Sequence, residues 1–94
     1  MSSDTLLDAL SAVTDEATLL AFVEALTADR QLAESLPVSL DGHQGPWASQ
    51  TILEFLRASA AWAHDSEFGV RPGPKSDNPW QLFANLLWAG RGYE

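Results

Sequence analysis

The sequence predicts an all-α fold, arranged as one compact domain over residues 1–94. Apolar residues recur three and four positions apart in four segments, which is the period of amphipathic helices. Residues that commonly begin or end helices stand at the borders of these segments. A chain of 94 residues that is 46% apolar buries enough surface for one core but not for two. The four predicted helices span about residues 5–13, 15–34, 51–64 and 79–89.

The first two helices are predicted from short apolar stripes and acidic start signals. Asp4 or Thr5 can cap the first helix, and the second begins near Asp15, whose charge suits the positive end of the helix dipole. Pro37 lies just beyond the second helix, and a loop follows. The stripes consist of Leu6, Leu7, Leu10 and Val13 in the first helix, and of Leu19, Phe22, Val23 and Leu26 in the second.

The third helix opens with a capping-box pair. Thr51 and Glu54 stand three residues apart, so each side chain can accept a hydrogen bond from a backbone amide that the first turn leaves unpaired. The apolar and small side chains behind this start fill one arc of about 160° on a helical wheel. We expect the whole arc to pack against the rest of the protein. It consists of Ile52, Phe55, Leu56, Ser59, Ala60, Trp62 and Ala63.

The fourth helix follows a loop rich in proline and glycine, residues 66–77. Asn78 is its predicted cap, Pro79 its first residue and Gly90 the left-handed residue that ends it. Gln81 and Asn85 are its only polar side chains, so we expect a central core helix. The third and fourth helices should form an aromatic-rich pair, with the second helix packing across them.

Charge and aromatic rings are distributed unequally along the chain. The net charge is −8, and residues 1–45 contain eight of the thirteen acidic residues but a single base, Arg30. Eight of the nine aromatic residues lie in residues 46–94. Because the acids of the first half fall opposite the apolar stripes, we expect a solvated acidic surface set against a separate aromatic layer.

The composition argues against several functional classes. Five scattered bases among thirteen acids cannot neutralise a phosphate track, so we expect no nucleic-acid partner. His43 and His64 alone cannot build a metal site, and no cysteine is present to help them. No two acids are marked as converging in a pocket, which disfavours catalysis. We therefore predict neither a metal nor a cofactor.

The chain carries no signal that directs it to a membrane. No stretch approaches the roughly 18–20 unbroken apolar residues that cross a bilayer. The first four residues lack the basic flank and the apolar run of a secretory signal. We expect a cytoplasmic protein without a membrane partner.

Several short motifs together carry a family resemblance. They are Trp-Ala-x-Asp-Ser from Trp62 to Ser66, Asn-Pro-Trp-x-x-Phe-Ala from Asn78 to Ala84, and the closing pair Tyr93 and Glu94. Over nearly its whole length the chain resembles a family of small uncharacterised bacterial proteins, a domain of unknown function. The resemblance implies a compact helical domain and carries no catalytic residues. By analogy it suggests an immunity or accessory protein of bacterial conflict systems.

The sequence favours a non-enzymatic protein-binding module, such as an immunity-like inhibitor, over an enzyme. The acidic half would steer a basic protein partner, and exposed rings near Trp47 and Trp88 would supply affinity. Trp47 stands in a Gly-Pro loop without periodic partners, so it either folds back over the core or is an exposed aromatic anchor. Asp65 is expected to cap or orient the loop that follows it.

Two alternatives stay open at this point. One is a small-molecule-binding domain with a tryptophan-lined cleft and polar contacts from the third and fourth helices. The other is a structural homodimer through the last helix, so the protein is either a monomer or a homodimer. The candidate binding residues under these hypotheses are Trp47, Arg57, His64, Asp65, Asn85 and Trp88.

Overall fold

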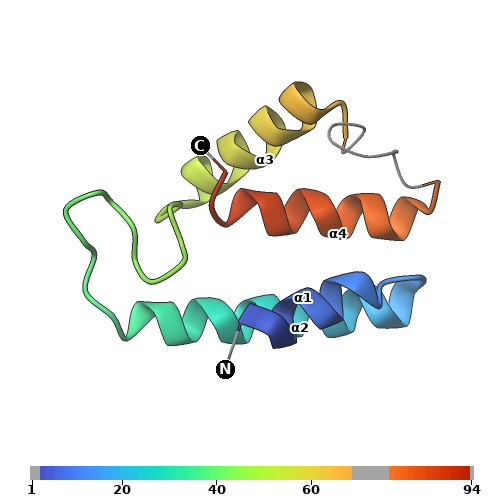
Figure 1. Ribbon diagram of the computed structural model, residues 1–94, viewed down its shortest axis with the longest axis horizontal. Coiled ribbons are helices and arrows are strands. Elements are labelled where there is room, and N and C mark those ends of the chain that lie inside the picture. Colours follow the sequence, from blue (N-terminus) through green and yellow to red (C-terminus); the bar gives the residue numbers. More distant parts are fainter. Residues whose placement is uncertain (1–2, 69–76, 94) are drawn as a thin grey trace.

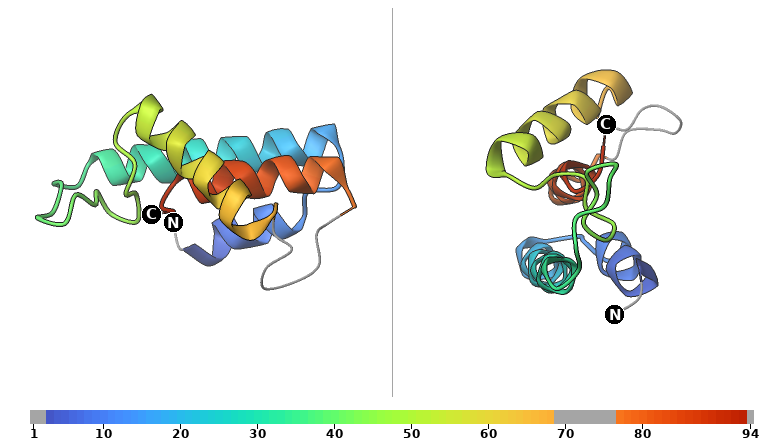
Figure 2. Two further views of the ribbon diagram at one scale, coloured as in Figure 1. Left: turned by 90° about the horizontal axis from the view of Figure 1, so that it is seen from above. Right: turned by 90° about the vertical axis from the view of Figure 1, so that its left-hand side faces the viewer.

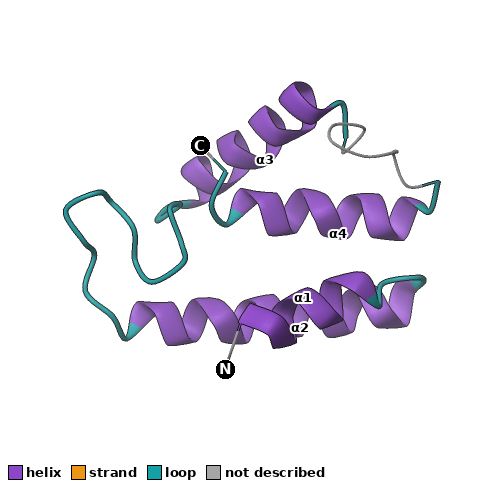
Figure 3. Ribbon diagram, in the orientation of Figure 1, coloured by secondary structure: helices purple, strands orange, loops and turns teal. Residues whose placement is uncertain are grey.

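The computed structural model describes residues 3–68 and 77–93, which form four α-helices joined by loops (Figure 3). The loop before α3 contains two isolated β-bridges, and the described residues form no strand. The all-α prediction is confirmed. Most of the predicted Pro/Gly-rich loop, residues 69–76, lies outside the described residues. The helices are α1 (Ser3–Ser11), α2 (Glu16–Glu34), α3 (Ile52–Ser66) and α4 (Pro79–Gly90).

The helices are arranged as two hairpins in layers (Figures 1 and 2). Figure 2 shows α3 outermost, α4 in the middle, and α1 and α2 together on the far side. Among the described helices, α4 packs against all three others, whereas α3 packs against α4 alone. The prediction of a central fourth helix is therefore confirmed. The second helix packs across α4 as expected but does not reach α3.

The hydrophobic core lies between the α1–α2 layer and α4. Phe22 of α2 and Ala84 of α4 are fully buried at its centre, and Leu6 and Val13 close it from the α1 side. Trp47 reaches it from the loop between α2 and α3. The buried members of this core are Leu6, Val13, Leu19, Phe22, Leu26, Ala33, Trp47 and Ala84.

Three helices begin at the capping residues that the sequence indicates. Asp15 caps α2, and its carboxylate accepts a hydrogen bond from the Thr18 amide at 2.9 Å. Thr51 caps α3 in the predicted capping box with Glu54. The side-chain oxygen of Asn78 accepts a hydrogen bond from the Trp80 amide at 2.9 Å and caps α4, whose first residue is proline. Helix starts in this protein thus depend on local side-chain chemistry.

Two predictions at helix ends are wrong. The first helix begins at Ser3, so Asp4 and Thr5 lie inside it and not at the position before its first residue. Gly90 is the last residue of α4 and has no left-handed backbone, and Arg91 follows it with a right-handed helical conformation. A Cβ at Gly90 would overlap Ser59 Oγ and lie 2.9 Å from Phe55 Cε1. The glycine is therefore needed for the close approach of α4 to α3.

The predicted buried arc of α3 is only half buried. The half with Phe55, Ser59 and Trp62 packs toward α4. The other half stays open, with Ile52 79% and Leu56 58% exposed. Because α3 packs against α4 alone, that single neighbour cannot cover an arc of this width. The result is an apolar surface on the outside of the molecule, which in folded proteins commonly marks an interaction site.

Candidate functional site

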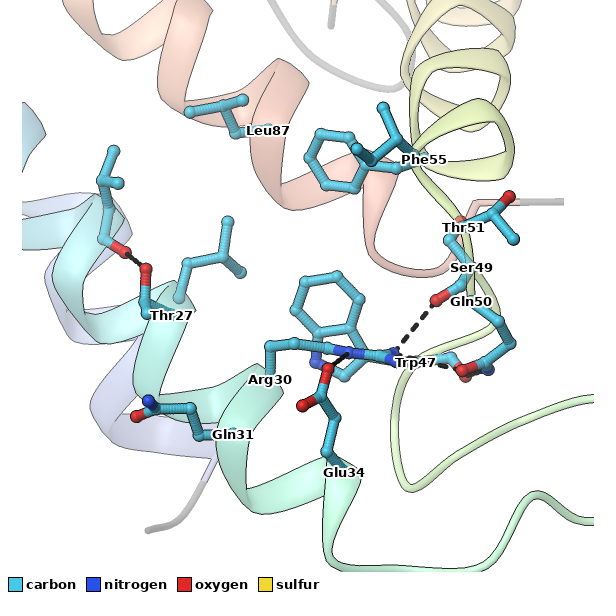
Figure 4. Close-up of a pocket in the computed structure, with 13 residues that line it drawn as sticks. Thr27, Arg30, Gln31, Glu34, Trp47, Ser49, Gln50, Thr51, Phe55 and Leu87 are labelled. Carbon is cyan, nitrogen blue, oxygen red and sulfur yellow. Dashed lines mark hydrogen bonds and ion pairs between the residues drawn. The ribbon is translucent and has the colours of Figure 1, made fainter.

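An open apolar groove lies between α2 and the start of α3, and α4 contributes Leu87 to its lining (Figure 4). Its volume is about 590 Å³. It exists because α2 and α3 both pack on α4 but not on each other. We call it the α2–α3 groove. It is lined by Val23, Leu26, Thr27, Arg30, Gln31, Glu34, Trp47, Ser49, Gln50, Thr51, Ile52, Phe55 and Leu87.

The apolar side chains of the groove come from three helices and one loop. Figure 4 shows Phe55 and Leu87 on one side of the hollow and Arg30 with Glu34 on the other. The indole of Trp47 lies between them and stacks on Phe55 with ring centroids 6.3 Å apart. The groove therefore has an apolar interior with polar groups along α2 and beside the start of α3, as protein sites for apolar ligands usually do.

Trp47 folds back over the core. The residue is only 6% exposed, and its indole Nε1–H donates a hydrogen bond to Asp29 Oδ2 at 2.9 Å. The guanidinium of Arg30 lies 5.3 Å from the ring centroid, within the range of a cation–π contact. The alternative of an exposed anchor at Trp47 is therefore wrong, because a hydrogen bond and two ring contacts hold the indole inside. Trp47 instead supports the wall of the groove.

Arg30 fixes the loop between α2 and α3 onto α2. Its Nε donates to Glu34 at 3.0 Å, and its terminal nitrogens donate to the carbonyl of Ser49 and to the side-chain oxygens of Gln44 and Gln50 at 3.1–3.2 Å. A guanidinium has five N–H donors, so four of them are already engaged. Arg30 is therefore a structural residue of the groove, and little of its hydrogen-bonding capacity is left for an anionic ligand.

Asp29 corrects the expectation that the acids of the first half are solvated. It is 7% exposed, and its Oδ2 accepts hydrogen bonds from Trp47 and, at 3.1 Å, from Arg91. Arg91 also stacks on Trp88, with its guanidinium carbon 5.4 Å from the ring centroid. This buried ion pair joins α2 to the end of α4 directly behind the groove.

The other candidate residues from the sequence do not come together. Arg57 and His64 line two separate hollows on α3, and Trp88 lines a third beside Tyr93. Asn85 accepts a hydrogen bond from Gln81 at 3.0 Å within α4. The cleft that would combine Arg57, His64 and Asn85 as polar contacts is therefore not present in this arrangement.

The remaining two candidate residues, Trp88 and Asp65, contact other parts of the same chain. Trp88 is partly buried, and its indole Nε1 is buried without a hydrogen-bond partner in the described part of the chain. Asp65 accepts a hydrogen bond from the Tyr93 hydroxyl at 2.5 Å, which ties α3 to the segment after α4. That hydrogen bond, together with burial and the Asp65 charge, raises the pKa of Tyr93 above its usual value of 10.0. Asp65 thus contacts the segment after α4.

Two further findings concern metals and membranes. In residues 3–68 and 77–93, no three histidine or acidic side chains gather in a way that could hold a metal ion. None of the described helices combines the length and the apolar character needed to cross a bilayer.

Sequence reasoning missed most residues of the groove. The apolar spacing places Ile52, Phe55 and Leu87 on buried faces, and Arg30 stands out in the sequence as the single base among acids and as a weak continuation of the second helix's stripe. The signal that could have identified the groove was the width of the α3 arc, because one neighbouring helix covers only a narrower stripe.

The fold and the groove define a small all-α domain with an open apolar surface between its second and third helices. The chain belongs to a family of unknown function (DUF7660), whose family model matches residues 14–94. This match confirms the resemblance to a domain of unknown function. No curated protein and no solved structure matches the chain.

Proposed function

We propose that the protein is a non-enzymatic protein-binding module whose α2–α3 groove accepts an apolar segment of a basic partner. The observation that carries this proposal is the groove itself: an open, largely apolar hollow of about 590 Å³ continuous with exposed apolar residues of α3. Apolar surfaces of this kind on small domains are typical of sites that another protein covers. The groove, which Trp47 helps to line, takes the place of exposed tryptophan rings as the surface that supplies affinity.

The charges near the groove favour a basic partner. Glu16, Glu24 and Glu34 are exposed on α2. Of the described arginines, Arg30 pairs with Glu34, Arg91 pairs with the buried Asp29, and Arg57 is exposed on α3 but lines a separate hollow. The exposed charge beside the groove is therefore mainly negative. Such a surface raises the association rate of a positively charged partner and makes that rate depend on ionic strength.

Binding of two model peptides tests this proposal. Both carry leucines in the same positions, and the remaining positions are lysine in one peptide and glutamate in the other. We expect the Leu/Lys peptide to bind, more weakly as salt is raised, and the Leu/Glu peptide not to bind, by fluorescence anisotropy of the labelled peptides. Failure of the Leu/Lys peptide to bind, or equal binding of both peptides, would contradict the proposal.

A matched pair of variants locates the binding surface. Ile52 and Leu53 are adjacent on α3 and both exposed, but only Ile52 is among the groove residues. Ile52→Ser is expected to weaken peptide binding, whereas Leu53→Ser leaves it nearly unchanged. Both variants should keep the stability of the wild type to within about 0.5 kcal/mol, because substitutions of exposed residues rarely do more.

A small-molecule ligand is a second candidate, favoured by the size of the groove. Its volume lies within the roughly 300–1,000 Å³ of typical ligand pockets. A ligand that binds only the folded state raises the melting temperature, so a thermal-shift screen detects it. A small molecule that the Leu/Lys peptide does not displace, or that binds the Ile52→Ser variant as well as the wild type, binds outside the groove.

We propose that the protein acts in the cytoplasm. The chain has no cysteine and therefore needs no oxidising environment to form disulfide bonds. An immunity-like inhibitor of a basic toxin is one form of this function. A toxin gene beside the gene for this protein supports that form, and a metabolic operon supports the small-molecule alternative.

A further inference from the structure

A second apolar hollow lies next to the groove on the same side of α3. Its volume is about 370 Å³. We call it the α3–α4 hollow. It is lined by Leu56, Ser59, Ala60, Ala63, His64, Phe68 and Leu86. The proposed function does not involve this hollow.

The groove and the hollow lie next to each other along α3, and we call the two together the channel. Ile52 of the groove and Leu56 of the hollow are four residues apart, so they lie on one face of α3. On α4, Leu86 belongs to the hollow and Leu87 to the groove. Phe83, which is 49% exposed, stands three and four residues before them and so lies along the same side of α4. The apolar surface therefore runs along the corner between α3 and α4.

The length of the channel matches about three turns of a helix. From Ile52 to Ala63 the axis of α3 rises about 17 Å at 1.5 Å per residue. Along this length the side chains facing the channel change from large to small, from Ile52 and Leu56 to Ala60 and Ala63. Small residues on a helix surface allow a second helix to approach closely, so that its side chains fit between those of α3.

An extended peptide fits this channel less well than a helix. A bound strand obtains much of its affinity by pairing with an exposed sheet edge, and the described residues contain no strand. A helix satisfies its own backbone and needs only apolar contacts, which the channel offers. We infer that the occupant is an amphipathic α-helix of about three turns, with apolar residues three and four positions apart and basic residues beside them. This inference rests on the proposed function.

Charge disfavours a second copy of the chain as the occupant. Each copy has a net charge of −8. Docking one copy into the channel of another brings two acidic proteins together beside the exposed acids of α2, where like charges oppose association. A foreign helix with lysine or arginine next to its apolar face has the complementary charge.

The test compares two Leu/Lys peptides of identical composition and about 12 residues, the length of three helical turns. One places leucines with helical period and the other alternates them as in a strand. We expect the helical-period peptide to bind about ten-fold more tightly and to gain helical circular dichroism on binding, because only this pattern gathers the leucines on one face. Equal binding by the two patterns overturns the inference but leaves the proposed function standing. Binding by neither overturns both.

Variants of α3 test the continuity of the channel. Leu56→Ser should weaken binding of the helical-period peptide about ten-fold, as expected for the loss of one buried leucine contact, whereas Leu53→Ser should not. A peptide of about six residues, long enough for the groove alone, should respond to Ile52→Ser but not to Leu56→Ser. If Leu56→Ser has no effect on the longer peptide, the occupant does not reach the hollow. If light scattering shows a dimer that Leu56→Ser dissociates, a second copy is the occupant and the inference is wrong.

Discussion

Replacing Asp29 by asparagine tests the buried network that supports the groove. The substitution keeps an oxygen that can accept the hydrogen bond from Trp47 but removes the charge that pairs with Arg91. Both side chains are well buried, with 9% of Asp29 and 14% of Arg91 exposed. Asp29→Asn therefore leaves a cation largely shielded from water without its partner.

The magnitude follows from the burial of the pair. Removing one partner of a buried ion pair costs about 3–5 kcal/mol, and the lower end applies here because Arg91 keeps its contact with Trp88. In a domain of this size 1 kcal/mol changes the melting temperature by about 4–8 °C. A loss of about 3 kcal/mol therefore lowers the melting temperature by about 12–24 °C.

Thermal unfolding followed by circular dichroism measures this change. Glu24→Gln is the matched control, because Glu24 is an exposed acid on the same helix and its replacement should change stability by less than about 0.5 kcal/mol. The double variant Asp29→Asn with Arg91→Met should be more stable than Asp29→Asn alone, because it contains no unpaired buried charge. If Asp29→Asn behaves like Glu24→Gln, the reasoning about this network is refuted.

Three further predictions concern packing and pH. Gly90→Ala should destabilise the protein by about 1–3 kcal/mol in urea unfolding, since the added Cβ overlaps α3. Gly92→Ala is the control, because its Cβ would meet its nearest neighbour at 3.4 Å, and it should lower the free energy of unfolding by less. Hydrogen bonds from Thr18 lower the pKa of Asp15 below 3.8, so the stability it contributes is present above that pH and is lost as pH falls through the lowered pKa; Asp15→Ala should flatten this acid limb of the stability curve. The raised pKa of Tyr93 means that its contribution is full below about pH 10 and is lost at higher pH; Tyr93→Phe should remove this alkaline loss, and an unchanged curve would contradict the contact with Asp65.

The starts of α2, α3 and α4 were predictable from the sequence because they are decided over three or four residues. Asp15, Thr51 and Asn78 each cap the helix that follows, and the amides they bind lie within the next three positions. Their chemistry is complete before any tertiary contact forms. The same is true of the all-α pattern, which depends only on the spacing of apolar residues.

The width of the α3 arc indicates that some apolar surface stays open, but the position of the groove was not predictable because it depends on which helices meet. A helical wheel gives the directions of apolar side chains on α3 but not which half of them a neighbour covers. The pair of Asp29 with Arg91 joins residues 62 positions apart, so no local pattern announces it. Gly90 shows the same limit, because its position suggested a helix terminator while its close contact with α3 became visible only in three dimensions.

Backbone amide shifts in nuclear magnetic resonance spectra show directly whether a basic helix docks in the α2–α3 groove. The helical-period Leu/Lys peptide is added to the isotopically labelled protein, and the perturbed amides are mapped onto the fold. We expect changes concentrated in residues 23–34 of α2, residues 52–64 of α3, and Leu86 and Leu87 of α4, with little change in α1. Changes centred instead on the hollow beside Trp88 and Tyr93, or spread evenly over the acidic surface, would contradict the groove as the docking site.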